Sequence, residues 1–170
     1  LSEIWTRDNS PSYYLNISNN VLLNPYNYGI HIKEGNGHSI VNNTCNDGCL
    51  ELYNINDSDI RENNFIGDNS RYNRIYGNNL SNVNITNHIF VNQTAIYGGT
   101  ATYTIYLEGI DSFDVYVYNN SFQNCSNAGN MLIGTGNNYH IYDNDFWYND
   151  KAIYMSNTSN SEVYNNTFNL

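Results

Sequence analysis

The sequence predicts an all-β protein, a right-handed parallel β-helix (solenoid) of about seven coils that occupies residues 1–170 as a single domain. Two observations lead to this fold class. A short apolar pattern recurs along the whole chain, and the composition opposes helices. The 170 residues include 36 Asn and 17 Tyr, which favour turns and strands, whereas Lys and Arg together number 6.

The recurring pattern is an aliphatic residue, two spacers, an Asn-like residue, one spacer and a bulky apolar residue. Its copies occupy residues 17–22, 40–45, 60–65, 85–90, 117–122, 141–146 and 163–168. A second short strand precedes each copy, at 4–5, 29–32, 50–52, 75–76, 105–107, 131–133 and 153–155. The regular spacing of these copies is typical of a chain that winds once per repeat. Helical repeats do not fit, because no segment keeps apolar residues at helical spacing.

Alternation along the strands predicts which side chains point inward. The aliphatic positions and the bulky positions should form two inward columns, with phenylalanines stacked about 4.8 Å apart. A structural asparagine column is expected at the bend between them, with His88 in one coil: Asn20, Asn43, Asn63, Asn120, Asn144 and Asn166. We expect these asparagines to adopt the left-handed conformation of a sharp corner and to hydrogen-bond along the column.

This repeat resembles that of the parallel β-helix, or pectate-lyase-like, superfamily over essentially the whole chain. In its Asn-rich repeat it is most similar to the adhesin-like and surface-layer or sheath proteins of methanogenic archaea. The resemblance implies an extracellular or cell-surface structural protein. Because lyases, hydrolases, adhesins and phage spikes share this fold, the motif specifies the fold and leaves the activity open.

Charge and length narrow the classes of partner. A formal net charge of −10 repels phosphate backbones, so no nucleic-acid partner is expected. No apolar run approaches the roughly 18 residues of a transmembrane segment.

The chain begins at Leu1, which fits a processed protein or a fragment. Neither end carries a helical or charged cap, and we weigh head-to-tail stacking of chains equally against a fragment of a longer solenoid.

Outward aromatic side chains predict an interaction surface. Its members are Trp5, Tyr76, Tyr106, Tyr118, Tyr142, Tyr154 and Tyr164. Such stripes can pack against a neighbouring solenoid or stack on sugar rings, although tyrosine is also simply a good strand residue. The expected partner is the chain itself, in a head-to-tail or lateral homo-oligomer or filament. Glycans are the second class of partner.

Residues for catalysis are sparse, so we expect no catalytic residue and no enzyme; a polysaccharide lyase or hydrolase is the alternative. Arg61 near Asp59 is the only basic residue placed like the base of a lyase, and a salt-bridged surface pair is favoured. Acidic clusters such as Asp57, Asp59 and Glu62 are expected to be solvated. No cofactor or metal is predicted, with weak Ca²⁺ binding as the alternative.

The cysteines and asparagines suggest two covalent modifications, a disulfide and N-glycosylation. Cys45 and Cys49 flank a tight turn, so a disulfide between them is geometrically allowed and suits an oxidising exterior. Cys125 lies three coils away and is expected to be free, buried or paired between chains. Ten asparagines stand in Asn-x-Ser/Thr frames that permit N-glycosylation: Asn16, Asn42, Asn56, Asn79, Asn84, Asn92, Asn119, Asn124, Asn157 and Asn165.

Overall fold

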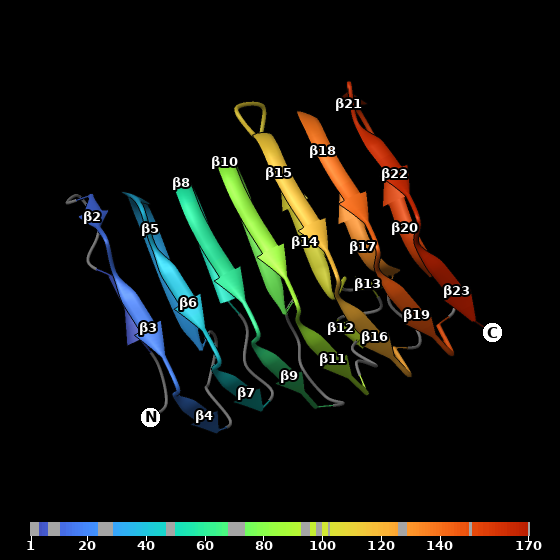
Figure 1. Cartoon of the computed structure of the whole chain (residues 1–170), viewed down its shortest axis with the longest axis horizontal. Coiled ribbons are helices and arrows are strands. Elements are labelled where there is room, and N and C mark those ends of the chain that lie inside the picture. Colours follow the sequence, from blue (N-terminus) through green and yellow to red (C-terminus); the bar gives the residue numbers. More distant parts are fainter. Residues whose placement is uncertain are drawn as a thin grey trace.

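The computed structural model of the chain is a β-solenoid whose strands lie parallel in neighbouring coils (Figure 1). It describes residues 4–6, 11–23, 29–46, 50–67, 74–92, 96–97, 100–101, 103–125, 129–149 and 151–169. Within these ranges every regular element is a strand, so no helix long and apolar enough to span a membrane occurs there. The predicted all-β parallel solenoid is confirmed.

The larger sheet has 14 strands and carries two rows, named face 1 and face 2. Face 1 contains β1 (Ile4–Trp5), β5 (Ile30–Asn36), β8 (Leu50–Arg61), β10 (Ile75–Thr86), β14 (Ile105–Glu108), β17 (Gly129–Ile133) and β20 (Lys151–Met155). Face 2 contains β3 (Asn16–Ser18), β6 (Ser39–Val41), the second halves of β8 and β10, β15 (Phe113–Tyr118), β18 (Gly136–Tyr142) and β22 (Glu162–Tyr164). Two short strands flank these rows, β2 (Ser12–Tyr13) beside β5 and β21 (Thr158–Ser159) beside β18.

The smaller, 7-stranded sheet forms the third side, named face 3. It contains β4 (Val21–Leu23), β7 (Thr44–Asn46), β9 (Asn64–Ile66), β11 (Ile89–Val91), β16 (Ser121–Gln123), β19 (Asp145–Trp147) and β23 (Thr167–Asn169). Outside the rows, β12 (Ile96–Tyr97) and β13 (Thr100–Ala101) form an antiparallel pair. The chain makes about six turns, close to the expected seven coils.

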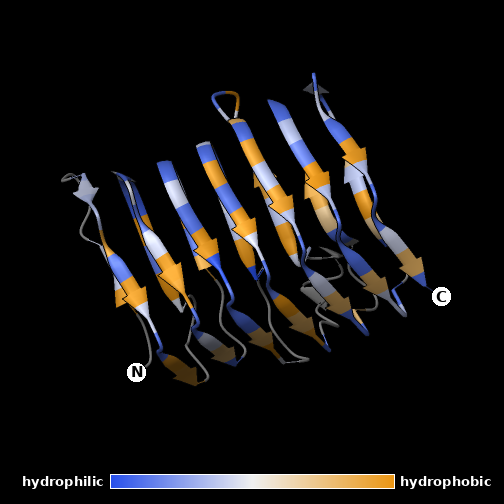
Figure 2. Ribbon diagram, in the orientation of Figure 1, coloured by the Kyte–Doolittle hydropathy of each residue, from blue (hydrophilic) through white to orange (hydrophobic). Residues whose placement is uncertain are grey.

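The register between coils places the predicted repeat positions over one another, and hydrophobic bands lie at matching levels on neighbouring strands (Figure 2). The aliphatic file on face 2 runs Ile17, Ile40, Ile60, Ile85, Val117, Ile141 and Val163. The bulky file on face 3 runs Leu22, Cys45, Phe65, Phe90, Phe122, Phe146 and Phe168. Its phenylalanine rings stack at centroid distances of 4.7–5.2 Å. Both predicted columns are confirmed.

Burial along these files is complete in the middle coils and lower in the last one. Phe90 and Phe122 are fully buried, and each such side chain contributes about 1.5–3 kcal/mol by leaving water. Val163 is 46% exposed and Phe168 is 58% exposed, although Phe168 still stacks on Phe146. These two residues lie in the last coil, where each file has a neighbouring coil on one side only.

Faces 1 and 2 are joined more closely than the repeat indicates, because β8 and β10 each run for 12 residues across both faces. Left-handed residues bend these strands: Asn54 and Asp57 in β8 have φ of 53° and 46°. Each left-handed residue is followed by a buried one, Ile55 and Ser58, and these two pair in register with Leu80 and with a valine of β10. The repeat pattern predicted two separate strands here, and it did not predict this third group of inward side chains.

The expected backbone conformation of the asparagine column is wrong by one position. The left-handed residue at the corner between faces 2 and 3 is the one that precedes each column member. This position is held by Asn19, Asn42, Glu62, Asn87, Asn119, Asp143 and Asn165, with φ between 53° and 59°. The turn is made by the exposed residue, which frees the following side chain to point inward.

Candidate functional site

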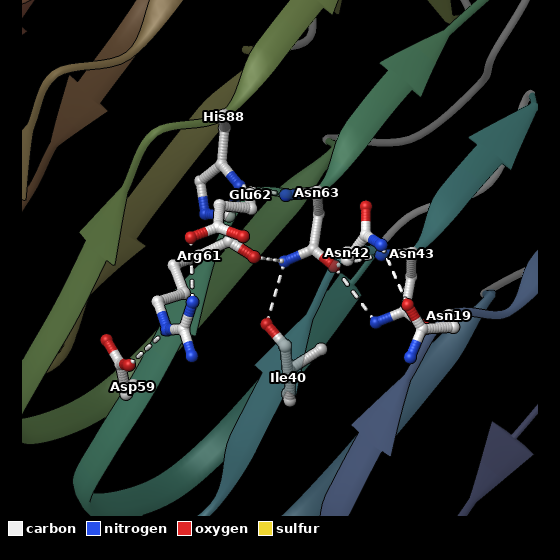
Figure 3. Close-up of polar contacts among 9 residues, drawn as sticks. All are labelled: Asn19, Ile40, Asn42, Asn43, Asp59, Arg61, Glu62, Asn63 and His88. Carbon is white, nitrogen blue, oxygen red and sulfur yellow. Dashed lines mark hydrogen bonds and ion pairs between the residues drawn. The ribbon is translucent and has the colours of Figure 1, made fainter.

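At the corner between faces 2 and 3 the asparagine column forms a hydrogen-bonded ladder (Figure 3). Asn43 donates from its backbone N–H and from Nδ2 to Asn63 Oδ1, both at 2.9 Å. Asn20 makes the same pair of bonds to Asn43, and Asn120 makes it to Asn144. The ladder satisfies polar groups that the corner would otherwise bury without partners, so it holds consecutive coils in register.

His88 replaces asparagine in one coil and continues the ladder. Its Nδ1 accepts the backbone N–H of Asn63 at 3.0 Å, and its own backbone N–H donates to Asn120 Oδ1 at 2.9 Å. The ring packs edge-on against Phe65 and Phe90, at centroid distances of 5.7 and 5.9 Å. Burial lowers the pKa of His88 to about 3. A neutral imidazole held in this way is a structural element of the corner.

The basic residue singled out in the sequence, Arg61, is engaged in ion pairs on face 2 (Figure 3). Its Nε donates to Asp59 Oδ2 at 2.8 Å, and its Nη1 donates to Glu62 Oε1 at 2.7 Å. The expected salt-bridged surface pair is therefore confirmed. Across the part of the chain that the structure describes, no group of three or more His, Cys, Asp or Glu side chains is placed to hold a metal ion. Weak Ca²⁺ binding stays a prediction.

Face 1 carries a polar cluster that the sequence analysis did not identify as a unit. In its first half, His31 Nδ1 lies 2.5 Å from Glu51 Oε2, and Tyr53 donates its hydroxyl to Glu51 Oε1 at 2.9 Å. The Glu51 residue is only 5% exposed. Trp5 covers the imidazole, with a ring-centroid distance of 4.5 Å to His31. A nearly buried carboxylate is thus satisfied by two protein donors.

In the second half of this cluster, Glu108 accepts two tyrosine hydroxyls. Tyr76 donates to Oε1 and Tyr106 donates to Oε2, each at 2.5 Å. Burial and the carboxylate raise the pKa of Tyr76 to about 12 and also raise the pKa of Tyr106. The Tyr53 and Tyr76 rings meet edge to face at 5.4 Å and link the two halves.

We name this cluster the tyrosine–carboxylate network; its members are His31, Glu51, Tyr53, Tyr76, Tyr106 and Glu108. Each of its two carboxylates accepts a hydrogen bond at both oxygens. A substrate that used either carboxylate as a base would have to displace a protein donor. The register could have revealed the network, because His31, Glu51, Tyr76 and Tyr106 occupy successive coils of one outward column.

A different aromatic surface lies on face 2, where Tyr118, Tyr142 and Tyr164 form the tyrosine column. Their rings are nearly parallel, with centroids 4.9 Å apart between Tyr118 and Tyr142 and 5.0 Å apart between Tyr142 and Tyr164. Beside this column, Tyr116 stacks on His140 at 4.7 Å. Burial and the neighbouring phenols raise the pKa of Tyr142. The stacked rings form a continuous aromatic ridge on the outer side of face 2.

The seven residues predicted as one interaction surface are therefore divided between two faces. Tyr76 and Tyr106 are half-buried in the tyrosine–carboxylate network. Trp5 and Tyr154 lie on the same face and are 54% and 58% exposed. The remaining three residues form the tyrosine column on face 2. The sequence pattern placed these side chains outward on two different strands of the repeat, and the structure puts those two strands on different faces.

The cysteines are only partly described. Cys45 occupies the bulky file and is buried, and burial raises the pKa of its thiol to about 12. Cys49 lies outside the described residues, so the Cys45–Cys49 disulfide stays a prediction. Cys125 is also buried, with its Sγ 3.7 Å from the carbonyl oxygen of Phe90.

The asparagines of all ten Asn-x-Ser/Thr frames fall within the described residues, and none of them is buried. Seven of them have positive φ: Asn42, Asn79, Asn92, Asn119, Asn124, Asn157 and Asn165. In three frames, those of Asn42, Asn119 and Asn165, a left-handed corner asparagine is followed by a ladder asparagine and a Ser or Thr that opens a strand. The fold alone accounts for these three frames, and glycosylation stays a prediction.

Comparison with known proteins finds no match: neither a family model, nor a curated protein, nor a solved structure resembles the chain significantly. Functional inference therefore depends on the chemistry of the described surfaces.

Proposed function

We propose that the chain is an extracellular structural solenoid, of the adhesin, surface-layer or sheath kind, that associates with copies of itself. The observation that carries this proposal is the tyrosine column. Three stacked phenols in consecutive coils form a flat ridge along the solenoid axis, and tyrosine is enriched at protein interfaces because its ring is apolar and its hydroxyl is polar. Such a surface can pack against the same surface of a second copy in a two-fold arrangement.

The surrounding architecture supports a structural role. The asparagine ladder, the phenylalanine stack and the carboxylates of face 1, which bond to His31 and Tyr76 of the preceding coils, all stabilise the coil-to-coil register. Association of copies is opposed by the net charge of −10, so it should strengthen as salt screens the repulsion. Lateral packing through the tyrosine column and end-to-end stacking of coils are both compatible with this chemistry.

Static light scattering and negative-stain microscopy across protein and salt concentrations test the proposal. We expect the average mass to rise with both concentrations. The triple variant Tyr118→Thr, Tyr142→Thr, Tyr164→Thr keeps strand propensity and should lower that mass. Tyr13→Thr is the matched control, since Tyr13 is 61% exposed and lies outside the column. A monomer at every condition contradicts self-association, and an unaffected triple variant contradicts the role of the column.

A second candidate function is the binding or cleavage of a polysaccharide on face 1. It is favoured by the tyrosine–carboxylate network, which places two carboxylates and three tyrosines on one face. The test is to incubate the protein with acidic and neutral polysaccharides, with and without Ca²⁺, and to measure reducing ends and unsaturated products. Glu108→Gln should abolish turnover, whereas Glu162→Gln on face 2 should not. Absence of products from every polymer removes the enzymatic form of this function.

A further inference from the structure

A hollow of about 400 Å³ lies where three strands of face 3 end. Its lining comes from three successive coils: Val91, Asn92, Gln123, Asn124, Trp147 and Tyr148. The register places Val91, Gln123 and Trp147 at the same final position of β11, β16 and β19. The volume lies in the range of small-ligand sites, about 300–1,000 Å³, and the hollow is on a different face from both aromatic surfaces described above.

The backbone at Tyr148 is unusual for its residue type. The residue that follows each of these strands is left-handed, with φ of 56° at Asn92, 55° at Asn124 and 54° at Tyr148. Asparagine tolerates this conformation, whereas an aromatic side chain does so at a cost. Tyr148 is 69% exposed, so burial of its ring does not compensate for that cost. Strained residues that the fold retains cluster at binding sites.

The surrounding hydrogen bonds fix this conformation. The backbone N–H of Tyr148 donates to the carbonyl oxygen of Asn169 at 2.9 Å. The next residue, Asn149, accepts the backbone N–H of Cys125 at 3.0 Å and donates to the carbonyl oxygen of Phe122 at 3.0 Å. The Tyr148 ring is therefore presented from a rigid corner, and little ordering is required when a ligand binds.

The lining that the structure describes combines two exposed aromatic rings with amides and includes no charged side chain. Trp147 is 43% exposed and is adjacent to Tyr148. Asn124 Nδ2 donates to Asn92 Oδ1 at 2.8 Å, which orients both amides at the rim of the hollow. Sugar rings present apolar C–H faces that stack on aromatic rings, and their hydroxyls pair with amide donors and acceptors. The net charge of −10 disfavours anionic ligands.

We propose that this hollow binds a neutral oligosaccharide. Trp147 and Tyr148 stack on sugar rings, and the amides of Gln123 and Asn124 hydrogen-bond the hydroxyls. Successive coils are about 4.8 Å apart, close to the length of one sugar unit in an extended chain. The coils of β11 and β16 therefore offer amides to neighbouring sugar units, and the coil of β19 offers the two aromatic rings. The site goes beyond self-association and does not use the tyrosine–carboxylate network.

Tryptophan fluorescence provides a direct measurement, because the chain has only 2 Trp residues. Trp5 lies on β1 of face 1, so Trp5→Phe leaves Trp147 as the single indole reporter. This variant is titrated with hexasaccharides of β-1,4-linked glucose, β-1,4-linked N-acetylglucosamine and α-1,4-linked glucose. A galacturonic acid hexamer serves as the anionic probe. We expect at least one neutral probe to shift the emission saturably at millimolar concentration or below, and the anionic probe to bind more weakly.

Two matched variants in the same background identify the site. Tyr148→Asn restores the residue type found at the equivalent corners of the two preceding coils, so the protein is expected to fold while it loses one stacking ring. Its affinity should fall about tenfold, the loss of one aromatic contact. Tyr14→Asn makes the same change at another left-handed tyrosine, with φ of 55° and 80% exposure, outside the hollow. Its affinity should be unchanged.

Three results would overturn the proposal. The first is that no neutral hexasaccharide changes the tryptophan emission. The second is that Tyr148→Asn binds as tightly as its parent, and the third is that the emission depends on protein concentration alone. The last result would assign the hollow to contacts between copies. Self-association is measured separately by light scattering, so loss of saccharide binding with unchanged mass, or the reverse, distinguishes failure of one proposal from failure of the other.

Discussion

Asn144 Oδ1 accepts two hydrogen bonds from Asn120, one from its backbone N–H and one from Nδ2, each 3.0 Å long. Both side chains are buried, at 1% exposure or less. Asn144 Oδ1 thus satisfies two donors of the preceding coil. Asn120, which supplies these donors, in turn accepts the backbone N–H of His88 in the coil before it. This relationship makes the stability of each coil depend on the next.

Asn144→Ala should lower the free energy of unfolding by about 2–4 kcal/mol, because two buried donors of Asn120 lose their acceptor. Asn20→Ala is the matched control. Asn20 is half-buried and donates to Asn43, so its loss should cost at most about 1 kcal/mol. Urea unfolding followed by far-ultraviolet circular dichroism measures both. Equal losses in the two variants would show that the ladder is not the source of the effect.

The pH dependence of stability should carry a contribution from His88. Burial lowers the folded-state pKa of His88 to about 3, whereas the unfolded chain titrates near 6.5. Below pH about 6.5 the unfolded state binds the extra proton. Stability is then lost progressively as the pH falls from about 6.5 towards 3, by up to about 1.4 kcal/mol per pH unit. Above this window the contribution is fully present.

His88→Asn removes the titrating group and keeps an acceptor in the ladder. The variant should show a flatter stability curve between pH 7 and pH 4 than the unmodified protein, measured by urea midpoints at each pH. Carboxylates titrate in both proteins, so the difference between the curves isolates the histidine. Curves that remain parallel through this window would contradict the assignment of a neutral buried imidazole.

The repeat positions were predictable because each inward file uses apolar residues of one class at one place in the period. Ile60 and Phe65 are examples, and their files are in register as expected. The bends within β8 and β10 were not predictable from this pattern, because left-handed Asn54 and Asp57 look like ordinary turn residues in an Asn-rich chain.

The site residues were harder to predict for a related reason. Glu51 and Glu108 are linked by the ring contact between Tyr53 and Tyr76 and by the bond from Tyr76 to Glu108, both of which cross between coils. Their connection therefore depends on the register and on side-chain reach. The left-handed conformation of Tyr148 had no signal in its residue type, since tyrosine favours strands. Aligning Tyr148 with Asn124 in the preceding coil would have provided that signal.

Gly109 should be intolerant of a side chain. Its φ is 120°, and a Cβ there would lie 2.2 Å from Asn79 Oδ1 and 2.5 Å from the Asn79 backbone nitrogen. Gly109→Ala is expected to cost about 2–3 kcal/mol through strain and a shifted neighbour. Gly134→Ala is the control, because its Cβ would meet no atom closer than 3.2 Å, and it should cost less than about 1 kcal/mol. Thermal unfolding compares the two, and equal midpoints would contradict the steric argument.

Replacing Tyr148 by asparagine should make the protein more stable. Relief of the left-handed strain is worth about 0.5–1 kcal/mol, and the ring is 69% exposed, so little burial is lost. Tyr14→Asn should give a similar gain, since Tyr14 has φ of 55° and is 80% exposed. Urea midpoints of the two variants measure the gains. If only Tyr148→Asn also loses saccharide binding, the strain at Tyr148 is retained for its ring. A destabilised Tyr148→Asn would instead mean that the ring packs productively in the hollow, and the argument from strain would fail.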